Sequence, residues 1–390
     1  MITLLRNVNV YSPTHLGMND ILIANDKIAA IAPAIHLSSD AVRVIDGQGL
    51  AAMPGLVDSL VHITGGGGEG GFHTRTPEMQ LTEASLHGVT TVIGALGTDA
   101  TTRSLEELVA KAKALNYEGI SAYCYTGSYH LPPPTITGSV TKDIMLIDPI
   151  IGIGEVAIAD HRSSQPTVNE LAKVAAEARV GGMLSNKKGI VSIHTGDSEE
   201  KLQMLHRVVD ESDIPAHQFY PTHINRNQSL LEAGKAWAQR GGYIDMTTST
   251  NAQFIAEGEI PAADAIAWCL QQGISATQLT MSSDGNASLP VFDNHGQLVG
   301  LEVGRVASLF NAFSTLASTS GVSMEQAIRT VSTSSADILK LPTKGRLIAG
   351  SDADIVLFDA TTFDIHHVFA KGQHMTQEGV ALVKGTFEDL

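Results

Sequence analysis

The sequence predicts an α/β protein that combines a (β/α)8 barrel of the TIM type with a small β domain formed by both termini. Apolar runs of strand length recur eight times between residues 56 and 284, and most precede a segment with helical spacing. Short strand-like pieces without helix-length periodicity fill both ends of the chain. The length of 390 residues suits one large barrel plus a small domain, although two to three ordinary domains would also fit.

Both ends of the chain have the same β-rich character. Strand-like pieces at 2–11, 20–24, 27–33 and 43–46 are separated by Asn-Asp and Asp-Gly turn signals. From Gly345 onward the pattern returns, with a strand at 355–358 and another near Val368. We therefore expect a small β-sandwich domain from residues 1–53 plus 343–390, and a barrel from residues 54–342.

The region between the ends alternates strands and helices. The strand-like runs are 56–63, 89–95, 120–126, 150–158, 190–195, 217–224, 243–249 and 279–284. Helical spacing is clearest at 168–179, 198–209, 229–239, 262–272 and 323–341, and Ser323 with Gln326 forms a capping-box pattern for the last. Eight such units favour a barrel whose chemistry lies at the C-terminal ends of its strands. A doubly wound sheet is the alternative.

Composition excludes several classes of partner. With 25 Lys and Arg against 41 Asp and Glu, the net charge of −16 argues against nucleic acid and anionic membranes. Cys124 and Cys269 lie far apart in apolar segments, which is typical of reduced thiols in a cytosolic protein. The N-terminal stretch has no signal-peptide pattern, and no run of 18 apolar residues occurs. We expect a cytoplasmic protein, in which binding of a small acidic molecule would require local arginines.

The stretch from 53 to 69, MPGLVDSLVHITGGGGE, reads as the first barrel strand and its active-site loop. Asp58, Leu60 and His62 alternate on one face of an apolar strand, as inward-pointing barrel residues do. Four consecutive glycines then lead to Glu69. A flexible linker is one interpretation of this run, but its position directly after a strand favours a functional loop.

Polar residues of metal-binding type end four of the other strands. Glu155 lies on the fourth, His194 on the fifth, His223 on the sixth and Asp284 on the eighth. Each alone could be a surface group, a satisfied core histidine or an ion-pair partner. Together they are the ligand types of a hydrolytic zinc site. A buried charge of this kind costs several kcal/mol unless a partner such as a divalent cation compensates it.

Residues 152–157, GIGEVA, also match the dinucleotide-binding pattern G-x-G-x-x-A. That fingerprint opens a helix near the start of a βαβ unit. Here the apolar strand continues to Ile158 and then meets Asp160. The context therefore argues against a nucleotide site.

Several motifs occur in a characteristic order: PGLVD with a strand histidine, GGGGE, TGSYH, ADHRS, PTHINRN and SSDGN. Together they resemble the isoaspartyl (β-aspartyl) dipeptidases, a branch of the amidohydrolase superfamily, over nearly the whole chain. The resemblance implies an amidohydrolase barrel with strands of both termini beside it. It also implies a homo-oligomer, with an octamer as the family pattern.

The chain departs from the family pattern at two positions. Leu60 stands where the family has the first histidine of a His-x-His pair, and Glu155 stands where it has a carboxylated lysine that bridges two metals. In this respect the chain is similar to the amino-sugar deacetylases, which hold one metal with Glu, His and His. We expect one tightly bound Zn²⁺ held by Glu155, His194 and His223, and a weak or empty second position at His62 and Asp284.

The resemblance also implies roles in substrate binding. It assigns the α-ammonium of the substrate to Glu69, the aspartyl α-carboxylate to Arg226 and the carboxylate of the leaving residue to Arg162. Arginine is suited to such bidentate recognition, although each could equally be a surface ion-pair partner. Tyr129 would stabilise the oxyanion, although a packed loop tyrosine is the ordinary alternative. Two residues complete the implied pocket: Thr98 and Ser288.

The implied reaction is metal-dependent hydrolysis of β-aspartyl dipeptides. Metal-bound hydroxide would attack the side-chain amide, and Asp284 would act as general base and then as general acid. Two alternatives stay open. One is an amidohydrolase or deacetylase that acts on another N-acyl or N-carbamoyl amino acid. The other is a non-catalytic binder, for which Leu60 is the main support.

Overall fold

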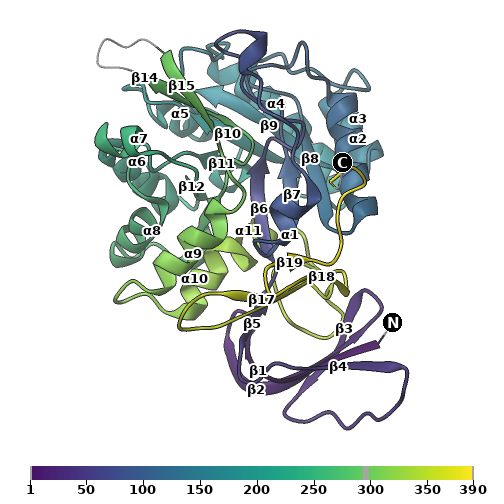
Figure 1. The fold of residues 1–390 in the computed structure, drawn as a ribbon. Helices are drawn as coiled ribbons and strands as arrows, with labels where there is room; N and C mark the ends of the chain where they lie inside the picture. The colour runs from purple at the N-terminus through teal and green to yellow at the C-terminus, as the bar shows by residue number, and fades with distance from the viewer. Residues whose placement is uncertain (1, 293–297, 389–390) are drawn as a thin grey trace.

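The centre of the molecule is a ring of eight parallel strands (Figure 1). The structure, a computed structural model, describes residues 2–292 and 298–388. Six strands pair in the order β11-β10-β9-β8-β7-β6, and β12 pairs with β13. The strands are β6 (Leu56–Val61), β7 (Val89–Gly94), β8 (Ser121–Thr126), β9 (Ile150–Ile158), β10 (Ile190–Thr195), β11 (Phe219–Thr222), β12 (Ile244–Thr247) and β13 (Leu279–Ser282).

Backbone hydrogen bonds beyond these strands close the ring. Ile224 N donates to Asp245 O at 3.2 Å between β11 and β12. At the other seam, Asp284 N donates to Leu60 O at 3.1 Å and His62 N donates to Gly285 O at 2.8 Å. The eight strands therefore follow chain order around a closed barrel, as predicted, and the doubly wound alternative is excluded.

The barrel interior is filled with side chains. An apolar cluster inside the ring includes Leu60, which is 2% exposed, together with Tyr125, Ile151, Ile190 and Tyr220. Because both faces of barrel strands are buried, their sequences read as nearly continuous apolar runs. The interior is a packed core that also holds the buried carboxylates of Asp58 and Asp245, whereas the pocket lies at the strand ends and the loops that follow them.

Helices surround the ring (Figure 1). They are α1 (Leu81–Ser85), α2 (Leu105–Glu118), α3 (Val140–Leu146), α4 (Val168–Leu184), α5 (Gln203–Glu211), α6 (Gln228–Gln239), α7 (Ala252–Ala256), α8 (Ala262–Gln271), α9 (Ser308–Ala317), α10 (Met324–Val331) and α11 (Thr333–Ile338), with short 3-10 turns η1 (Phe72–Thr74), η2 (Ala216–Gln218) and η3 (Ala276–Gln278). The capping box of Ser323 and Gln326 is present. The single helix predicted over 323–341 is wrong, because Ser332 leaves helical geometry and separates α10 from α11.

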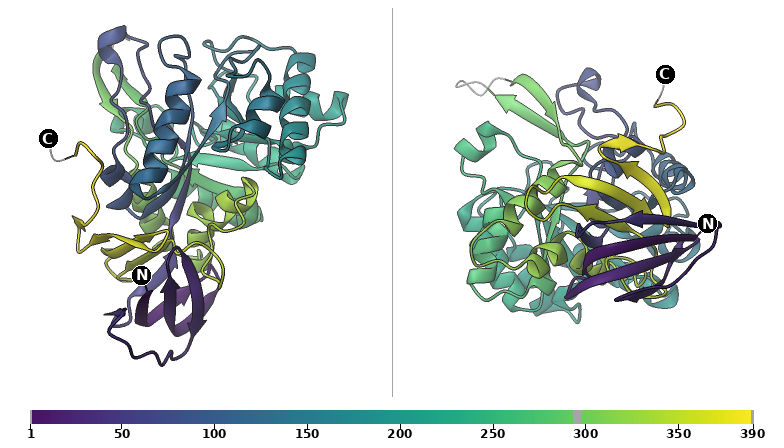
Figure 2. Two further views of the ribbon diagram at one scale, coloured as in Figure 1. Left: turned by 90° about the vertical axis from the view of Figure 1, so that its right-hand side faces the viewer. Right: turned by 60° about the horizontal axis from the view of Figure 1, so that its bottom comes forward.

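Strands of both termini form one nine-stranded sheet at the end of the barrel (Figures 1 and 2). They are β1 (Ile2–Tyr11), β2 (His15–Ala24), β3 (Lys27–Ala32), β4 (Val42–Asp46), β5 (Ala51–Pro54), β16 (Ile355–Phe358), β17 (Ile365–Ala370), β18 (Gln373–Gln377) and β19 (Val380–Ala381). The sheet joins the two ends through β5, which pairs with β1 and β16. It has its own apolar cluster, which includes Leu5, Ile21 and Phe369. The residue limits of the two domains stay a prediction.

A β-hairpin that the sequence did not predict follows β13. It consists of β14 (Ser288–Phe292) and β15 (Leu298–Val303), which pair antiparallel. Leu289 and Leu301 of this hairpin line a pocket at one end of the barrel. Within 2–292 and 298–388, no helix combines the length and apolar content needed to cross a membrane.

Candidate active site

A pocket of about 710 Å³ opens where the barrel strands end. Glu155 contacts two of its lining residues. All other site residues expected from the sequence line the pocket: His62, Glu69, Thr98, Tyr129, Arg162, His194, His223, Arg226, Asp284 and Ser288. Segments more than 200 residues apart in the chain therefore meet in one place, as the barrel topology requires.

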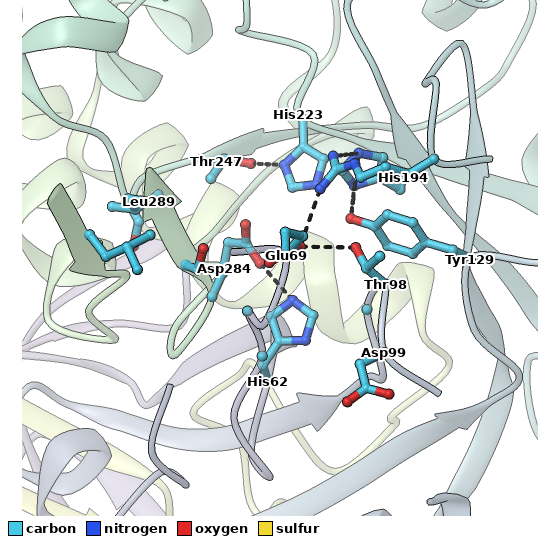
Figure 3. Close-up of a pocket in the computed structure, with 18 of the residues that line it drawn as sticks. His62, Glu69, Thr98, Asp99, Tyr129, His194, His223, Thr247, Asp284 and Leu289 are labelled. Carbon is cyan, nitrogen blue, oxygen red and sulfur yellow. Dashed lines mark hydrogen bonds and ion pairs between the residues drawn. The ribbon is translucent and has the colours of Figure 1, made fainter. Parts of the chain in front are cut away.

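Glu155 is the centre of the polar cluster. Its Oε1 atom lies 2.9 Å from His194 Nδ1 and 3.2 Å from His223 Nε2. The three side chains are buried, and one ligand atom of each lies within 4.8 Å of the others. Figure 3 shows the rings of His194 and His223 beside each other, with His62 across the pocket. The strand ends of β9, β10 and β11 thus bring a carboxylate and two imidazoles together.

Each histidine uses its other ring nitrogen to bind the protein. His194 Nε2 lies 3.0 Å from Asp160 Oδ2, and His223 Nδ1 lies 2.5 Å from Thr247 Oγ1. His62 Nδ1 lies 3.2 Å from the carbonyl oxygen of Ala95. Metal-binding histidines are oriented in this way, because the outer hydrogen bond fixes the tautomer and aims the inner nitrogen.

These residues fit a divalent metal ion. Glu155 Oε2 is buried without a hydrogen-bond partner, although such an atom normally has one. Burial raises the pKa of Glu155, but hydrogen bonds from His194 and His223 outweigh it and hold the pKa well below its usual range. An ionised carboxylate beside two imidazoles is a donor set that suits zinc.

His62 and Asp284 lie next to this group. His62 Nε2 is 3.2 Å from Asp284 Oδ1 and 3.9 Å from Glu155 Oε2. Burial lowers the pKa of His62, but the hydrogen bond to Asp284 and the charges of Asp284 and Glu155 outweigh it and raise the pKa to about 9. Leu60 belongs to the apolar cluster below, so it adds no ligand to this side of the site.

Two residues of the site have left-handed backbone conformations. The φ angle is 62° at His223 and 51° at Asp284. Residues other than glycine adopt left-handed backbone conformations at a cost of about 1–3 kcal/mol, and such strained residues cluster at functional sites. The turns after β11 and β13 thus place these two side chains at a cost in backbone strain.

One wall of the pocket carries charges of both signs. Glu69 Oε1 accepts a hydrogen bond from Thr98 Oγ1 at 3.0 Å and lies 3.4 Å from Arg162 Nη1. Arg226 Nη2 lies 3.5 Å from His194 Nε2, and its buried Nε atom has no hydrogen-bond partner. Burial and the charge of Arg226 lower the pKa of His223 to about 4. The cavity is therefore lined by a carboxylate that can bind an ammonium and by guanidinium groups that can bind carboxylates.

Tyr129 directs its hydroxyl to the centre of the site. The OH lies 2.8 Å from His194 Nδ1, and the guanidinium of Arg162 lies over the ring at 5.4 Å. Burial and the charge of Glu155 raise the pKa of Tyr129 well above its usual value. The hydroxyl therefore stays protonated at neutral pH and can donate a hydrogen bond.

Sequence reasoning missed several residues of the site. Asp160 lies in the ADHRS motif two positions before Arg162, and Thr247 ends the seventh strand, so the position of each in the sequence could have marked it as a site residue. No pattern in the sequence marks Arg103. It is buried and donates to the carbonyl oxygens of Gly66 at 3.2 Å and Thr76 at 3.0 Å, which holds the glycine loop in place.

Comparison with known proteins gives a consistent assignment. The amidohydrolase family model matches residues 51–375. The crystal structure of the β-aspartyl dipeptidase from the thermophilic, keratin-degrading Fervidobacterium islandicum AW-1, in complex with a β-Asp-Leu dipeptide, has a TM-score of 0.90 and 42% sequence identity, and the match covers 98% of both chains.

Curated relatives include dihydroorotases. That of Lactiplantibacillus plantarum is 23% identical over 399 residues, which span 92% of this chain and 89% of that protein. That of Elusimicrobium minutum is 44% identical over only 69 residues, which span 17% of this chain and 16% of that protein. The family model and the full-length match to a solved structure are decisive: this chain belongs to the amidohydrolase family, in which it is a hydrolase of the β-aspartyl dipeptidase group.

Proposed function

We propose that this chain hydrolyses β-aspartyl dipeptides with the help of one tightly bound Zn²⁺. The observation that carries the proposal is the arrangement of Glu69, Arg162 and Arg226 around the Glu155 group in one pocket. The similarity to the Fervidobacterium enzyme, whose complex contains β-Asp-Leu, supports the same substrate class.

The charges of the pocket are complementary to such a substrate. A β-aspartyl dipeptide carries an ammonium and a carboxylate on the aspartyl Cα, and a second carboxylate on the leaving residue. Glu69 would bind the ammonium, and Arg226 would hold the aspartyl α-carboxylate. Arg162 would hold the carboxylate of the leaving residue, while Thr98 and Ser288 complete the polar lining.

Glu155, His194 and His223 would hold the zinc ion, with His62 and Asp284 at its edge. When bound, such an ion polarises the amide carbonyl and makes water a stronger acid at neutral pH. The protein groups then have separate tasks. The carboxylate of Asp284 would take the proton of the attacking water and later give it to the departing amine. The hydroxyl of Tyr129 would donate to the developing oxyanion.

A panel of three compounds tests this proposal. Zinc-loaded protein should hydrolyse β-Asp-Leu and fail on N-acetyl-β-Asp-Leu, because acetylation removes the ammonium that Glu69 binds. It should also fail on N-acetylaspartate. Preference for the acetylated compounds would support the deacetylase alternative, and absence of turnover on all three would support the non-catalytic binder. Values of kcat/KM for each compound give the answer.

We further propose that the chain forms a homo-oligomer and works in the cytoplasm, as the family resemblance implies. Light scattering coupled to size-exclusion chromatography measures the subunit number. A monomer at micromolar concentration would contradict the first part of this proposal.

A further inference from the structure

Asp160 lies beside the proposed metal ligands Glu155, His194 and His223. It contacts both the ligand His194 and the pocket residue Arg162. It follows β9 and is 8% exposed. Its Oδ1 accepts hydrogen bonds from Arg162 N at 2.7 Å and Arg162 Nε at 3.0 Å. Its Oδ2 accepts from Arg162 Nη2 at 2.7 Å and lies 3.0 Å from His194 Nε2. One carboxylate therefore contacts both the guanidinium of Arg162 and the imidazole of His194.

The contact with Asp160 determines how His194 presents its ring. Guanidinium nitrogens of Arg162 and Arg226 lie 3.3 and 3.5 Å from His194 Nε2, but these atoms are donors. The carboxylate of Asp160 is the nearest of these partners and the acceptor among them, so this contact holds the orientation of the ring. In this orientation Nδ1 lies 2.9 Å from Glu155 Oε1 and 2.8 Å from the hydroxyl of Tyr129.

The same contact determines how Arg162 presents its guanidinium. Asp160 takes the Nε and Nη2 edge in a bidentate pair, which is the strongest geometry for arginine and a carboxylate. The Nη1 atom remains directed toward Glu69, across the pocket wall. The Nη1 side of Arg162, which Glu69 contacts, thus faces the cavity in which the leaving residue would lie.

We propose that Asp160 is a positioning residue that couples recognition of the leaving residue's carboxylate, at Arg162, to the orientation of the metal ligand His194. The inference rests on the proposed function for the identity of that carboxylate. A single rigid turn carries both contacts, because Gln165 Nε2 and Ser163 N also bind the carbonyl oxygen of Asp160, at 2.9 and 3.1 Å. The side chain of Asp160 therefore holds both Arg162, which would bind the substrate, and His194, which would bind the metal.

The test compares wild type with Asp160→Asn, Asp160→Glu and Arg162→Gln. Asparagine has one acceptor oxygen and cannot serve both partners, so Zn²⁺ affinity, measured by competition with a chelator, should fall about 10- to 100-fold. The preference for β-Asp-Leu over β-Asp-leucinamide, as a ratio of kcat/KM, should fall about tenfold or more. Arg162→Gln should lose the preference while keeping zinc affinity. Asp160→Glu should restore part of both.

Asp210→Asn is the matched control, because Asp210 pairs with Arg240 on the surface and should change neither quantity. The inference is overturned if Asp160→Asn keeps the zinc affinity of wild type, or if it keeps the preference for the free carboxylate. If Asp160→Asn does not fold, Asp160→Glu replaces it and should show smaller losses of both kinds; unchanged values overturn the inference.

The proposed function fails, independently of the role of Asp160, if wild type does not hydrolyse β-Asp-Leu. In that case calorimetry measures the preference as the ratio of the dissociation constants for β-Asp-Leu and its amide. The zinc affinity from chelator competition requires no turnover and is measured as before. Equal ratios in wild type and Asp160→Asn would again overturn the role of Asp160.

Discussion

Asp284 Oδ1 lies 3.2 Å from His62 Nε2, across the seam where the end of β13 meets the end of β6. Backbone hydrogen bonds between Asp284 and Leu60 and between His62 and Gly285 hold the two strand ends together. Burial raises the pKa of Asp284, but the hydrogen bond from His62 outweighs it and lowers the pKa. The carboxylate is therefore ionised at neutral pH, as a general base must be.

Arg226→Lys should raise KM for β-Asp-Leu about 10- to 100-fold and change kcat less. A lysine keeps the charge but cannot form the planar bidentate contact that we assign to the aspartyl α-carboxylate. Steady-state kinetics measures both constants. Arg207→Lys, in an exposed pair with Glu211, is the control. Equal KM values in Arg226→Lys and wild type would remove Arg226 from the substrate site.

Leu60→His should increase zinc binding from about one ion per chain toward two. The new imidazole would join His62 on the same strand face, which restores a His-x-His pair. Because Leu60 is 2% exposed in an apolar cluster, the variant should also be less stable in urea. Elemental analysis of the purified proteins gives the metal content. Two tightly bound ions in wild type would contradict the assignment of a single metal.

Lys344→Met should lower the free energy of unfolding by about 3–5 kcal/mol. The ammonium of Lys344 is 2% exposed and lies 2.7 Å from both Asp352 Oδ2 and Asp354 Oδ2. Its loss removes the ion pair of the buried Asp354 and leaves Asp352 paired with Lys27. Urea denaturation measures the change. Arg207→Met, in an exposed pair, should change it by less than about 1 kcal/mol. A similar small change for Lys344→Met would disprove the structural role.

His374 should make the protein sensitive to acid. Burial, and then the charges of Arg43 and His367, lower its pKa to about 4 in the folded chain. The unfolded chain binds this proton at about pH 6.5, so the stability is complete above that pH and declines as pH falls from 6.5 toward 4. Thermal unfolding should show a shallower decline in His374→Phe than in wild type. Parallel declines would contradict the assignment.

The fold followed from the sequence because a barrel strand is buried on both faces. Runs such as 150–158 and 190–195 are mostly apolar, interrupted by Glu155 and by Ser192, His194 and Thr195, and β9 and β10 occupy the same residues. The β14–β15 hairpin was not predicted, since its pairing depends on a contact between two short segments and not on a local pattern. The break at Ser332 was also invisible, because apolar periodicity continues through it.

The site followed from the sequence only in part. Residue type and position at strand ends predicted Glu155, His194 and His223, because several such groups buried at one end of a barrel are costly unless a cation compensates their charge. Asp160 was not predicted as a site residue, since an acid two positions before an arginine is common on surfaces. Its importance depends on the distance to His194, which only the packing of β9 against β10 determines.

The most direct test of the account is the turnover of β-Asp-Leu by zinc-loaded wild type and Asp284→Asn, measured side by side with metal content. The account predicts that wild type is active and that the variant loses about 10²–10⁴-fold in kcat, as expected for removal of a general base. Zinc should remain bound in both proteins through Glu155, His194 and His223. A wild type as slow as Asp284→Asn, or one without bound metal, would contradict the account.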